Sequence, residues 1–218
     1  MFASMSVLLC RRQFPALARL AVANRTLCSN VESTPVPPEE TDAAAPESST
    51  PAIRMADFSR LDVRVGRVTT CAEHPGNENW YISGLDVGEE HDRPIVSGLA
   101  KYVSSEELTG RLVMVFCNLK KSNFRDMPST AMIFACMKDE EVEILSVPEG
   151  SKPGDRIFVK EFDDLGPPDK VVNPKKTLWA GIKADLKVSN HLALYRNYPI
   201  VTSRGKITTV RLQDGLIG

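Results

Sequence analysis

Short runs in which apolar and polar residues alternate begin at Leu61 and recur to the end of the chain. In the first run, Leu61, Val63 and Val65 alternate with charged side chains, and Gly66 follows them. Because successive side chains of a strand point to opposite faces, this period of two predicts a half-exposed β-strand with a bend or bulge at Gly66. Helical periodicity is scarce, so the sequence favours a mainly β architecture.

Turn-forming residues divide the following sequence into further strands and one helix. His74–Asn79 contains Pro, Gly and Asn and predicts a loop, whereas Ser104 and the acids that follow it predict the start of a short helix. Short strands with a small helix between the third and the fourth are typical of the OB-fold, a five-stranded barrel. We therefore predict an OB-fold whose later strands lie at residues 80–87, 94–99, 112–117, 130–137 and 142–145.

A second pattern follows Pro153 and predicts a C-terminal α+β appendage packed on the barrel. Within residues 175–186, Leu178, Ile182 and Leu186 recur at every fourth position and predict an amphipathic helix. The apolar runs after it predict strands at residues 192–196, 200–202 and 207–211. The expected domain limits are residues 54–160 for the barrel and 161–218 for the appendage.

The N-terminal segment differs in composition from the rest of the chain. Residues 1–30 contain four arginines and no acid, which is typical of an organelle transit peptide, although a disordered basic terminus stays open. We favour the mitochondrion, with the plastid as the alternative. Residues 31–53 are dominated by Pro, Ser, Thr, Glu and Ala. They predict a disordered linker, because so few large apolar residues cannot offset the entropy of ordering.

Composition argues against several classes of protein and site. The five cysteines contain no C-x-x-C pair, so we expect no zinc site or disulfide framework, and Cys117 and Cys136 are interpreted as buried thiols. No catalytic motif, phosphate-binding loop or run of 18 apolar residues occurs, so we expect no enzyme activity, no cofactor and no membrane segment. The formal net charge is -1, so a polyanion must be met by a local basic patch.

Several short motifs together resemble a known family. They are SRLDVRVGRV (Ser59–Val68), HP (His74 and Pro75), LDVGE (Leu85–Glu89), VSGL (Val96–Leu99), NLK (Asn118–Lys120), PGDR (Pro153–Arg156) and NPKK (Asn173–Lys176). Each motif alone is weak. Their order and spacing from Phe58 to the C-terminus are similar to those of the tRNA-binding domain family of endothelial monocyte-activating polypeptide II. That family includes the cofactor of the synthetase complex and the tail of animal tyrosyl-tRNA synthetase.

This resemblance implies an OB barrel that binds tRNA with little sequence preference and that works with an aminoacyl-tRNA synthetase. It also implies that the appendage covers the edge of the barrel and mimics a dimer partner, so the module is expected to be a monomer. The function predicted on this basis is that of a non-catalytic, organellar cofactor that presents tRNA to a synthetase or a processing enzyme.

The predicted RNA-binding face centres on residues 118–125, where cations alternate with amides, a hydroxyl and an aromatic ring. Cations can meet phosphates, amides can reach base edges or the 2′-hydroxyl, and a ring can stack on a base. Composition alone favours a solvated loop here, and the resemblance favours RNA, with a core role for Met132 left open. The predicted RNA-binding residues are Asn118, Lys120, Lys121, Asn123, Phe124, Arg125, Ser129, Met132, Arg67, His74 and Lys101.

Three positions depart from the family pattern. Asn123 stands where relatives usually carry a basic residue, Asp126 replaces a glycine, and Trp80 replaces a leucine. The first two changes weaken the expected phosphate contacts, and Trp80 is either a stacking platform or a core residue. The alternative function is therefore a protein–protein interaction module of a synthetase complex that has lost most RNA binding. A third and more remote alternative is a cytokine function, because the heptapeptide Arg64–Thr70 resembles the cytokine heptapeptide of the animal homologue.

Overall fold

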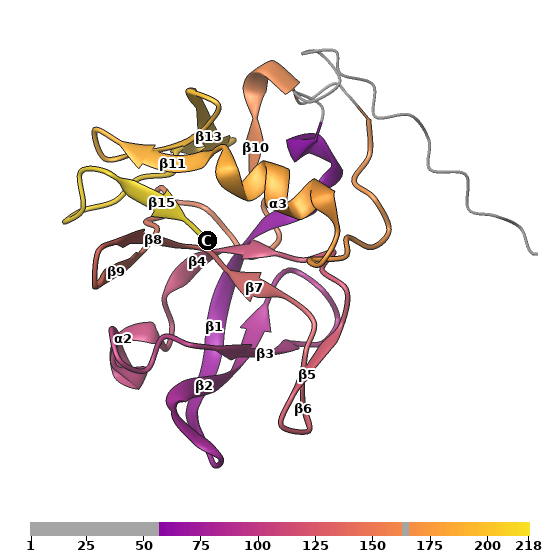
Figure 1. Cartoon of the computed structure of the whole chain (residues 1–218), viewed down its shortest axis with the longest axis vertical. Helices are drawn as coiled ribbons and strands as arrows, with labels where there is room; N and C mark the ends of the chain where they lie inside the picture. The colour runs from indigo at the N-terminus through magenta and orange to yellow at the C-terminus, as the bar shows by residue number, and fades with distance from the viewer. Residues whose placement is uncertain (1–56, 163–165) are drawn as a thin grey trace, which may run out of the picture. The chain divides into compact units, whose positions relative to one another are not determined.

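The computed structural model describes residues 57–162 and 166–218, which are mainly β (Figure 1). A 3-10 turn, η1 (Phe58–Arg60), leads into an antiparallel sheet of order β3-β2-β1-β4-β7. The short helix α2 (Ser105–Leu108) lies between β3 and β4, as expected for an OB-fold. The strands of this sheet are β1 (Val63–His74), β2 (Asn77–Asp86), β3 (Arg93–Ser97), β4 (Leu112–Phe116) and β7 (Met132–Ile133).

The sheet curls so that the segment before β7 returns to β3. Thr130 N donates a hydrogen bond to Pro94 O at 3.2 Å, and Val96 N donates to Ser129 Oγ at 3.2 Å. These bonds join the two edges of the sheet and satisfy backbone groups that would otherwise lack partners. The predicted fold class, a curled mainly β structure with a short helix between the third and fourth strands, is thus confirmed.

The bulge in β1 is not at Gly66, where the sequence predicted it. The register with β2 shifts between Val68 and Thr70, so the extra residue is Thr69. Gly66 instead pairs regularly with Val113, and a Cβ atom at Gly66 would come within 2.7 Å of a methyl carbon of Val115. Close packing, and not a bend, therefore requires a glycine at this position.

Two predicted boundaries in the first half of the chain were wrong. β1 extends to His74 and β2 begins at Asn77, so only Pro75 and Gly76 form the turn that the sequence extended to Asn79. The predicted strand at residues 130–137 is divided into β7 and β8 (Ala135–Lys138). The division occurs because the chain passes at Phe134 from the sheet that contains β4 to the sheet that contains β9 (Glu141–Ile144).

A small hairpin that the sequence did not predict lies between β4 and β7. Its strands are β5 (Ser122–Phe124) and β6 (Met127–Ser129), and Arg125 and Asp126 form the turn. The φ angles of Arg125 and Asp126 are 46° and 70°, the left-handed values that a two-residue type I′ turn requires. Such turns are usually Asn-Gly or Asp-Gly, so the sequence Arg-Asp gave no turn signal.

The appendage, residues 161–218, shares a second sheet with β8 and β9. The order of this sheet is β10-β13-β12-β11-β15-β8-β9, with β14 paired to β13, and the 3-10 turn η2 (Lys160–Phe162) follows β10. Because β15 pairs with β8, the sheet crosses the expected limit at residue 160, and that limit stays a prediction. The remaining strands are β10 (Phe158–Val159), β11 (Leu186–Ser189), β12 (Leu192–Tyr195), β13 (Tyr198–Thr202), β14 (Gly205–Lys206) and β15 (Gly215–Ile217).

The predicted amphipathic helix is α3 (Thr177–Ala184), which is shorter than the sequence pattern suggested. Leu186, assigned to its apolar face, instead begins β11, and within the helix Trp179 and Ile182 are the buried residues. The predicted strand at residues 207–211 was also wrong, because within it only Thr208 forms β-bridges, to Ser146 and Leu192. The last strand is β15, which the sequence analysis did not predict.

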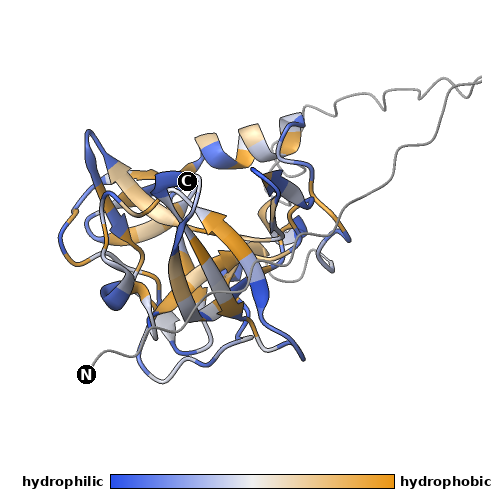
Figure 2. Ribbon diagram, turned by 90° about the horizontal axis from the view of Figure 1, so that it is seen from below, coloured by the Kyte–Doolittle hydropathy of each residue, from blue (hydrophilic) through white to orange (hydrophobic). Residues whose placement is uncertain are grey.

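The main hydrophobic core joins the appendage to the first sheet. The ring of Trp179 lies 5.2 Å from that of Phe116 and 6.1 Å from that of Phe134, measured between centroids. Figure 2 shows hydrophobic residues on the central strands and hydrophilic residues in many of the surrounding loops. Because aromatic side chains bury large apolar areas, this contact fixes α3 against the end of β4.

Cys117 and Cys136 are buried and form no disulfide, in agreement with the sequence interpretation. Burial raises the pKa of the Cys117 thiol to about 12 and that of Cys136 to about 11, so both are protonated at neutral pH. Among the described residues, no group of His, Cys, Asp or Glu side chains is placed to hold a metal ion. In the same part of the chain, no helix is long and apolar enough to cross a membrane.

Candidate nucleic-acid interface

Two segments that are far apart in the sequence run side by side just beyond β4. Val172 N donates to Asn118 O at 2.7 Å, and Lys120 N donates to Val172 O at 2.8 Å. Leu119 and Val172 thereby form a parallel bridge, and the Val172 side chain is buried. This pairing brings the lysines of the C-terminal segment next to those that follow β4.

Four lysines from these segments line one open groove. Lys120 and Lys121 follow β4, Lys170 lies in the paired C-terminal segment, and Lys176 is the N-cap of α3. We call this surface, defined by these four residues, the lysine groove. It has a volume of about 710 Å³. Other parts of its wall are formed by Arg93, Cys117, Asn118, Leu119, Thr130, Val171 and Asn173.

The lysine groove carries an excess of positive charge. Among the residues that the structure describes, no Asp or Glu lines it and none of the four lysines forms an ion pair. All four lysines are exposed. The N-terminus of α3 adds to this charge, because the side chain of its N-cap, Lys176, makes no capping hydrogen bond and the helix dipole is positive at this end. A groove with these properties attracts anions such as phosphate.

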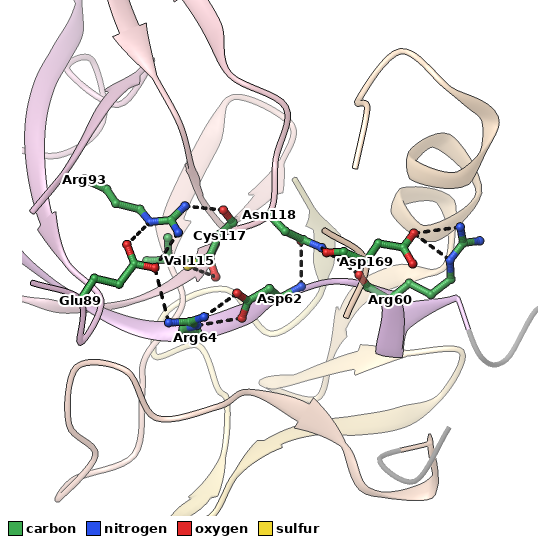
Figure 3. A network of polar contacts seen from close by, with 9 residues as sticks. All are labelled: Arg60, Asp62, Arg64, Glu89, Arg93, Val115, Cys117, Asn118 and Asp169. Carbon is green, nitrogen blue, oxygen red and sulfur yellow. Dashed lines mark hydrogen bonds and ion pairs between the residues drawn. The ribbon is translucent and has the colours of Figure 1, made fainter. Parts of the chain in front are cut away.

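The arginines beside the groove, in contrast, are paired with carboxylates (Figure 3). Arg93 forms a bidentate pair with Glu89 at 2.7 and 2.6 Å and also donates to Cys117 O. The hydrogen bond from Arg93 holds the pKa of the Glu89 carboxyl below its usual range. Arg64 pairs with Asp62 in the same way, at 2.8 and 2.7 Å. The unpaired positive charge of this surface therefore comes from the lysines.

Asn118 holds the two segments together from inside the protein (Figure 3). Its Nδ2 donates to Arg60 O at 2.9 Å and to Asp169 O at 2.7 Å, and its Oδ1 accepts from Asp62 N at 2.8 Å. The residue is only 9% exposed. The amide of Asn118 is thus engaged within the chain, where it positions the backbone next to Lys120, and its contact with RNA stays a prediction.

Beyond Lys121, the β5–β6 turn packs against the β1–β2 turn. His74 Nε2 lies 3.4 Å from Phe124 O, and Gly76 N donates to His74 Nδ1 at 3.0 Å, so the imidazole accepts at Nδ1 and can donate only from Nε2. In the opposite direction, the Arg125 guanidinium donates to Gly76 O. The two turns are thus tied together by bonds from both sides.

Three aromatic rings cluster at these turns, and we call His74, Trp80 and Phe124 the aromatic tip. Trp80 lies between the other two, with its ring centroid 5.4 Å from that of His74 and 5.7 Å from that of Phe124. Both pairs meet edge to face, a geometry that aromatic quadrupoles favour. The Arg125 guanidinium carbon lies 6.0 Å from the Trp80 ring centroid. Trp80 is therefore a supporting residue that is only partly buried.

Comparisons with known proteins show which family shares this sequence and fold. Residues 63–156 match the family model described as "Putative tRNA binding domain". The crystal structure of the C-terminal domain of Plasmodium vivax p43 aligns with a TM-score of 0.71 and 33% identity, over 75% of this chain and 99% of that domain. The chain belongs to this tRNA-binding domain family. The resemblance seen in the sequence motifs is thus confirmed.

Longer proteins also contain a region similar to this tRNA-binding domain. Aminoacyl tRNA synthase complex-interacting multifunctional protein 1 of Mus musculus is 41% identical over 162 residues, which are 74% of this chain and 50% of the relative. The cytoplasmic tyrosine–tRNA ligase of Danio rerio is 40% identical over 163 residues, or 73% of this chain and 31% of the ligase. The chain thus spans half or less of the length of these relatives.

Two other residues of the tRNA-binding domain that were predicted to contact RNA lie in its interior. Ser129 is 3% exposed, and its hydroxyl accepts from Val96 N and donates to Ala131 O at 3.1 Å. Met132 is half-buried and packs against the main core, which agrees with the alternative left open for it. The hydroxyl of Ser129 is used to close the curled sheet, and its contact with RNA stays a prediction.

The remaining predicted residues differ in their surroundings. His74 is 4% exposed and supports the aromatic tip from behind. Lys120, Lys121, Asn123, Phe124 and Arg125 are exposed along one continuous segment, so the structure keeps them together. Arg67 and Lys101 are exposed but do not line the lysine groove, and their contact with RNA stays a prediction.

Sequence reasoning missed Lys170 as a site residue and did not place Lys176 beside Lys120. The NPKK motif that includes Lys176 contributed to the family resemblance but carried no information about its neighbours. The pairing of Val172 with the segment after β4 is a long-range contact that no local pattern indicates.

Replacing Asp126 by glycine should stabilise the tRNA-binding domain by about 0.5–1 kcal/mol, since glycine adopts a positive φ without steric cost. Thermal unfolding of the wild type and of Asp126→Gly measures this effect. Asp126→Asn is the matched control for charge, because asparagine removes the carboxylate but keeps a side chain in the strained position. A lower melting temperature for Asp126→Gly would show that the turn is not strained.

Proposed function

We propose that this chain is a non-catalytic tRNA-binding protein that holds the phosphate backbone in the lysine groove. The observation that carries the proposal is the convergence of four lysines on one groove that no described Asp or Glu lines. They are Lys120, Lys121, Lys170 and Lys176. Phosphate affinity comes from such cations through release of condensed counterions. The Arg64 and Arg93 charges are compensated internally, so this groove supplies a local basic surface on a chain whose formal net charge is -1.

We expect the lysine groove to recognise the shape of the tRNA backbone and not its base sequence. Ammonium groups on flexible stems contact phosphates, which fix the position of a nucleic acid but carry no sequence information. The amide of Asn118, a side chain that could have contacted base edges in the groove, is engaged within the protein. Weak sequence preference is therefore the expected behaviour.

The names of the relatives support a cofactor role. One is a protein that interacts with the aminoacyl tRNA synthase complex, and another is a tyrosine–tRNA ligase. We propose that this chain raises the local concentration of tRNA for an aminoacyl-tRNA synthetase or a processing enzyme, in an organelle. Tethering a substrate near a second site acts through effective concentration and needs no new contact with the tRNA.

The organellar part rests on residues 1–53, which lie outside the described residues. A full chain with a fluorescent protein at its C-terminus should localise to mitochondria, or to plastids where these exist. Replacing Arg11, Arg12, Arg19 and Arg25 by glutamine should abolish import, because transit peptides depend on their basic character. Unchanged localisation of that variant would exclude the transit peptide.

Chemical acetylation of lysines with and without bound tRNA tests the proposed interface. Bound tRNA should slow the acetylation of Lys120, Lys121, Lys170 and Lys176, since phosphates would shield their ammonium groups. The exposed Lys138 and Lys187, on β8 and β11, are internal controls and should react at unchanged rates. Protection of the controls with no protection of the groove lysines would place the tRNA elsewhere.

A second candidate function is a protein–protein interaction module with little RNA binding. Asp126 and the exposed Asn123 favour it, because a cation is absent and a carboxylate is present on the segment next to the groove. Affinity purification of the full chain after nuclease treatment separates the two functions. A synthetase retained without RNA, together with no binding of added tRNA, would favour the interaction module.

A further inference from the structure

The aromatic tip presents one apolar ring to solvent beside the lysine groove. Phe124 is 38% exposed and stands at the turn of the β5–β6 hairpin, whereas His74 behind it is only 4% exposed. We propose that Phe124 is a stacking platform for one unpaired nucleobase and that Trp80 and His74 position it. This inference rests on the proposed function, because it assigns a base-binding subsite to the RNA whose phosphates lie in the groove.

The contacts of the three rings separate their roles. Trp80 has an aromatic partner on each side, since both His74 and Phe124 meet it edge to face, and the Arg125 guanidinium also lies over its ring. Phe124 has Trp80 as its only ring partner among the described residues. Trp80 is therefore the more covered ring, since it is half-buried, and Phe124, which is 38% exposed, is the ring available to a base.

The backbone of Phe124 is held in place by the neighbouring turn. His74 Nε2 lies within hydrogen-bonding distance of Phe124 O. Nδ1 of the same imidazole accepts a hydrogen bond from Gly76 N, and this bond fixes the position of the imidazole ring. The Arg125 guanidinium binds Gly76 O, so the residue after Phe124 is tied to the same turn. A platform fixed before the ligand arrives loses little conformational entropy on binding.

The position of Phe124 relative to the lysines favours a nucleotide as the ligand. Phe124 follows Lys121 by three residues, so their Cα atoms are at most about 11 Å apart. A phosphate at the groove and a base on the ring can thus belong to one nucleotide strand. The base must be unpaired, because a base inside a helix has both faces covered by its neighbours.

Three ligands distinguish the platform from the groove in experiments on the full chain. The first is an unpaired adenylate oligonucleotide, the second is a fully paired RNA duplex of the same length, and the third is heparin, a polyanion without bases. All three should compete for the lysine groove. Only the unpaired oligonucleotide should quench the fluorescence of Trp80. Trp179, the other tryptophan, is 9% exposed in the core and supplies an unchanging background.

Three variants show which ring gives the fluorescence change and which ring binds the base. Trp80→Phe should abolish the quenching, because the one tryptophan left, Trp179, is 9% exposed in the core. Phe124→Ala should weaken binding of the unpaired oligonucleotide about tenfold and leave heparin binding unchanged, within the range for one stacked base. Phe124→Tyr should bind like the wild type, which excludes misfolding of the hairpin as the cause of the loss.

The outcomes separate the stacking platform at Phe124 from phosphate binding in the lysine groove. Equal losses of heparin and oligonucleotide affinity in Phe124→Ala, or no loss of either, would overturn the platform while leaving the groove intact. Absence of binding by all three ligands to the wild type would overturn the proposed function and the platform with it.

Discussion

Replacing Lys120, Lys121, Lys170 and Lys176 together by alanine should lower the tRNA affinity of the full chain by about a hundredfold or more near 0.1 M salt. The reason is that each phosphate contact releases about 0.7–0.9 of a counterion, so four lost contacts remove most of the favourable entropy of binding. The logarithmic salt dependence should also become flatter by about three units. Fluorescence anisotropy of labelled tRNA at several salt concentrations measures both quantities.

A matched variant controls for the change in total charge. Lys138, Lys152, Lys187 and Lys206 are also exposed and also number four, but none of them lines the lysine groove. Their replacement by alanine should change the affinity only slightly, since they lie away from the proposed phosphate path. Equal losses in the two variants would mean that tRNA responds to net charge and not to the groove.

Glu143→Ala should destabilise the fold by about 1–3 kcal/mol, the cost of leaving buried hydrogen-bond donors without a partner. Glu143 is 4% exposed, and its carboxylate accepts hydrogen bonds from the backbone N–H groups of Val210, Arg211 and Leu212 at 2.7 to 3.1 Å. Without it, the loop before β15 has donors with no partner, and β15 is the strand that joins β8 to β11. Urea unfolding of the wild type and the variant measures the difference.

The contribution of Glu143 should depend on pH. Burial alone raises the pKa of the Glu143 carboxyl, but the hydrogen bonds from Leu212, Val210 and Arg211 outweigh it, and the pKa is lowered overall. The stability that Glu143 provides is therefore complete above the pKa of an unfolded glutamate, about 4.3, and is lost as the pH falls through the lower folded value. The gap in stability between the wild type and Glu143→Gln should shrink over that acidic range.

Glu140, on the exposed β8–β9 turn, provides the control for this prediction. Its replacement by glutamine should change the unfolding free energy by less than about 0.5 kcal/mol, as is usual at an exposed site. If Glu143→Gln and Glu140→Gln have the same stability at neutral pH, the Glu143 carboxylate does not anchor the loop.

Alternating patterns predicted the strands whose two faces have different surroundings. Val63 and Val65 are buried while Arg64 between them is half-buried, so β1 showed its period of two in the sequence. The N-cap serine of α2 was equally visible because capping is local. The β5–β6 hairpin was missed because Arg125 and Asp126 adopt the left-handed conformation without the glycine that normally signals it.

The candidate site was predicted only in part, because residue type does not show what a polar side chain contacts. Asn118 and Ser129 look like RNA ligands in the sequence, but their hydrogen-bonding groups are used inside the protein. The exposed Lys120 and Lys121 could be assigned from composition and the family resemblance together. Lys170 could not be assigned in this way, because it lines the groove only through the long-range pairing of Val172 with the segment after β4.

The most direct test of the proposed function is the affinity of the full wild-type chain for unfractionated tRNA over a series of salt concentrations. With four lysines on phosphates, the logarithm of the association constant should fall linearly with the logarithm of salt, with a slope of about −3. That result would establish a phosphate-binding tRNA protein. No binding at low salt, or an affinity that does not change with salt, would contradict the central role of the lysine groove.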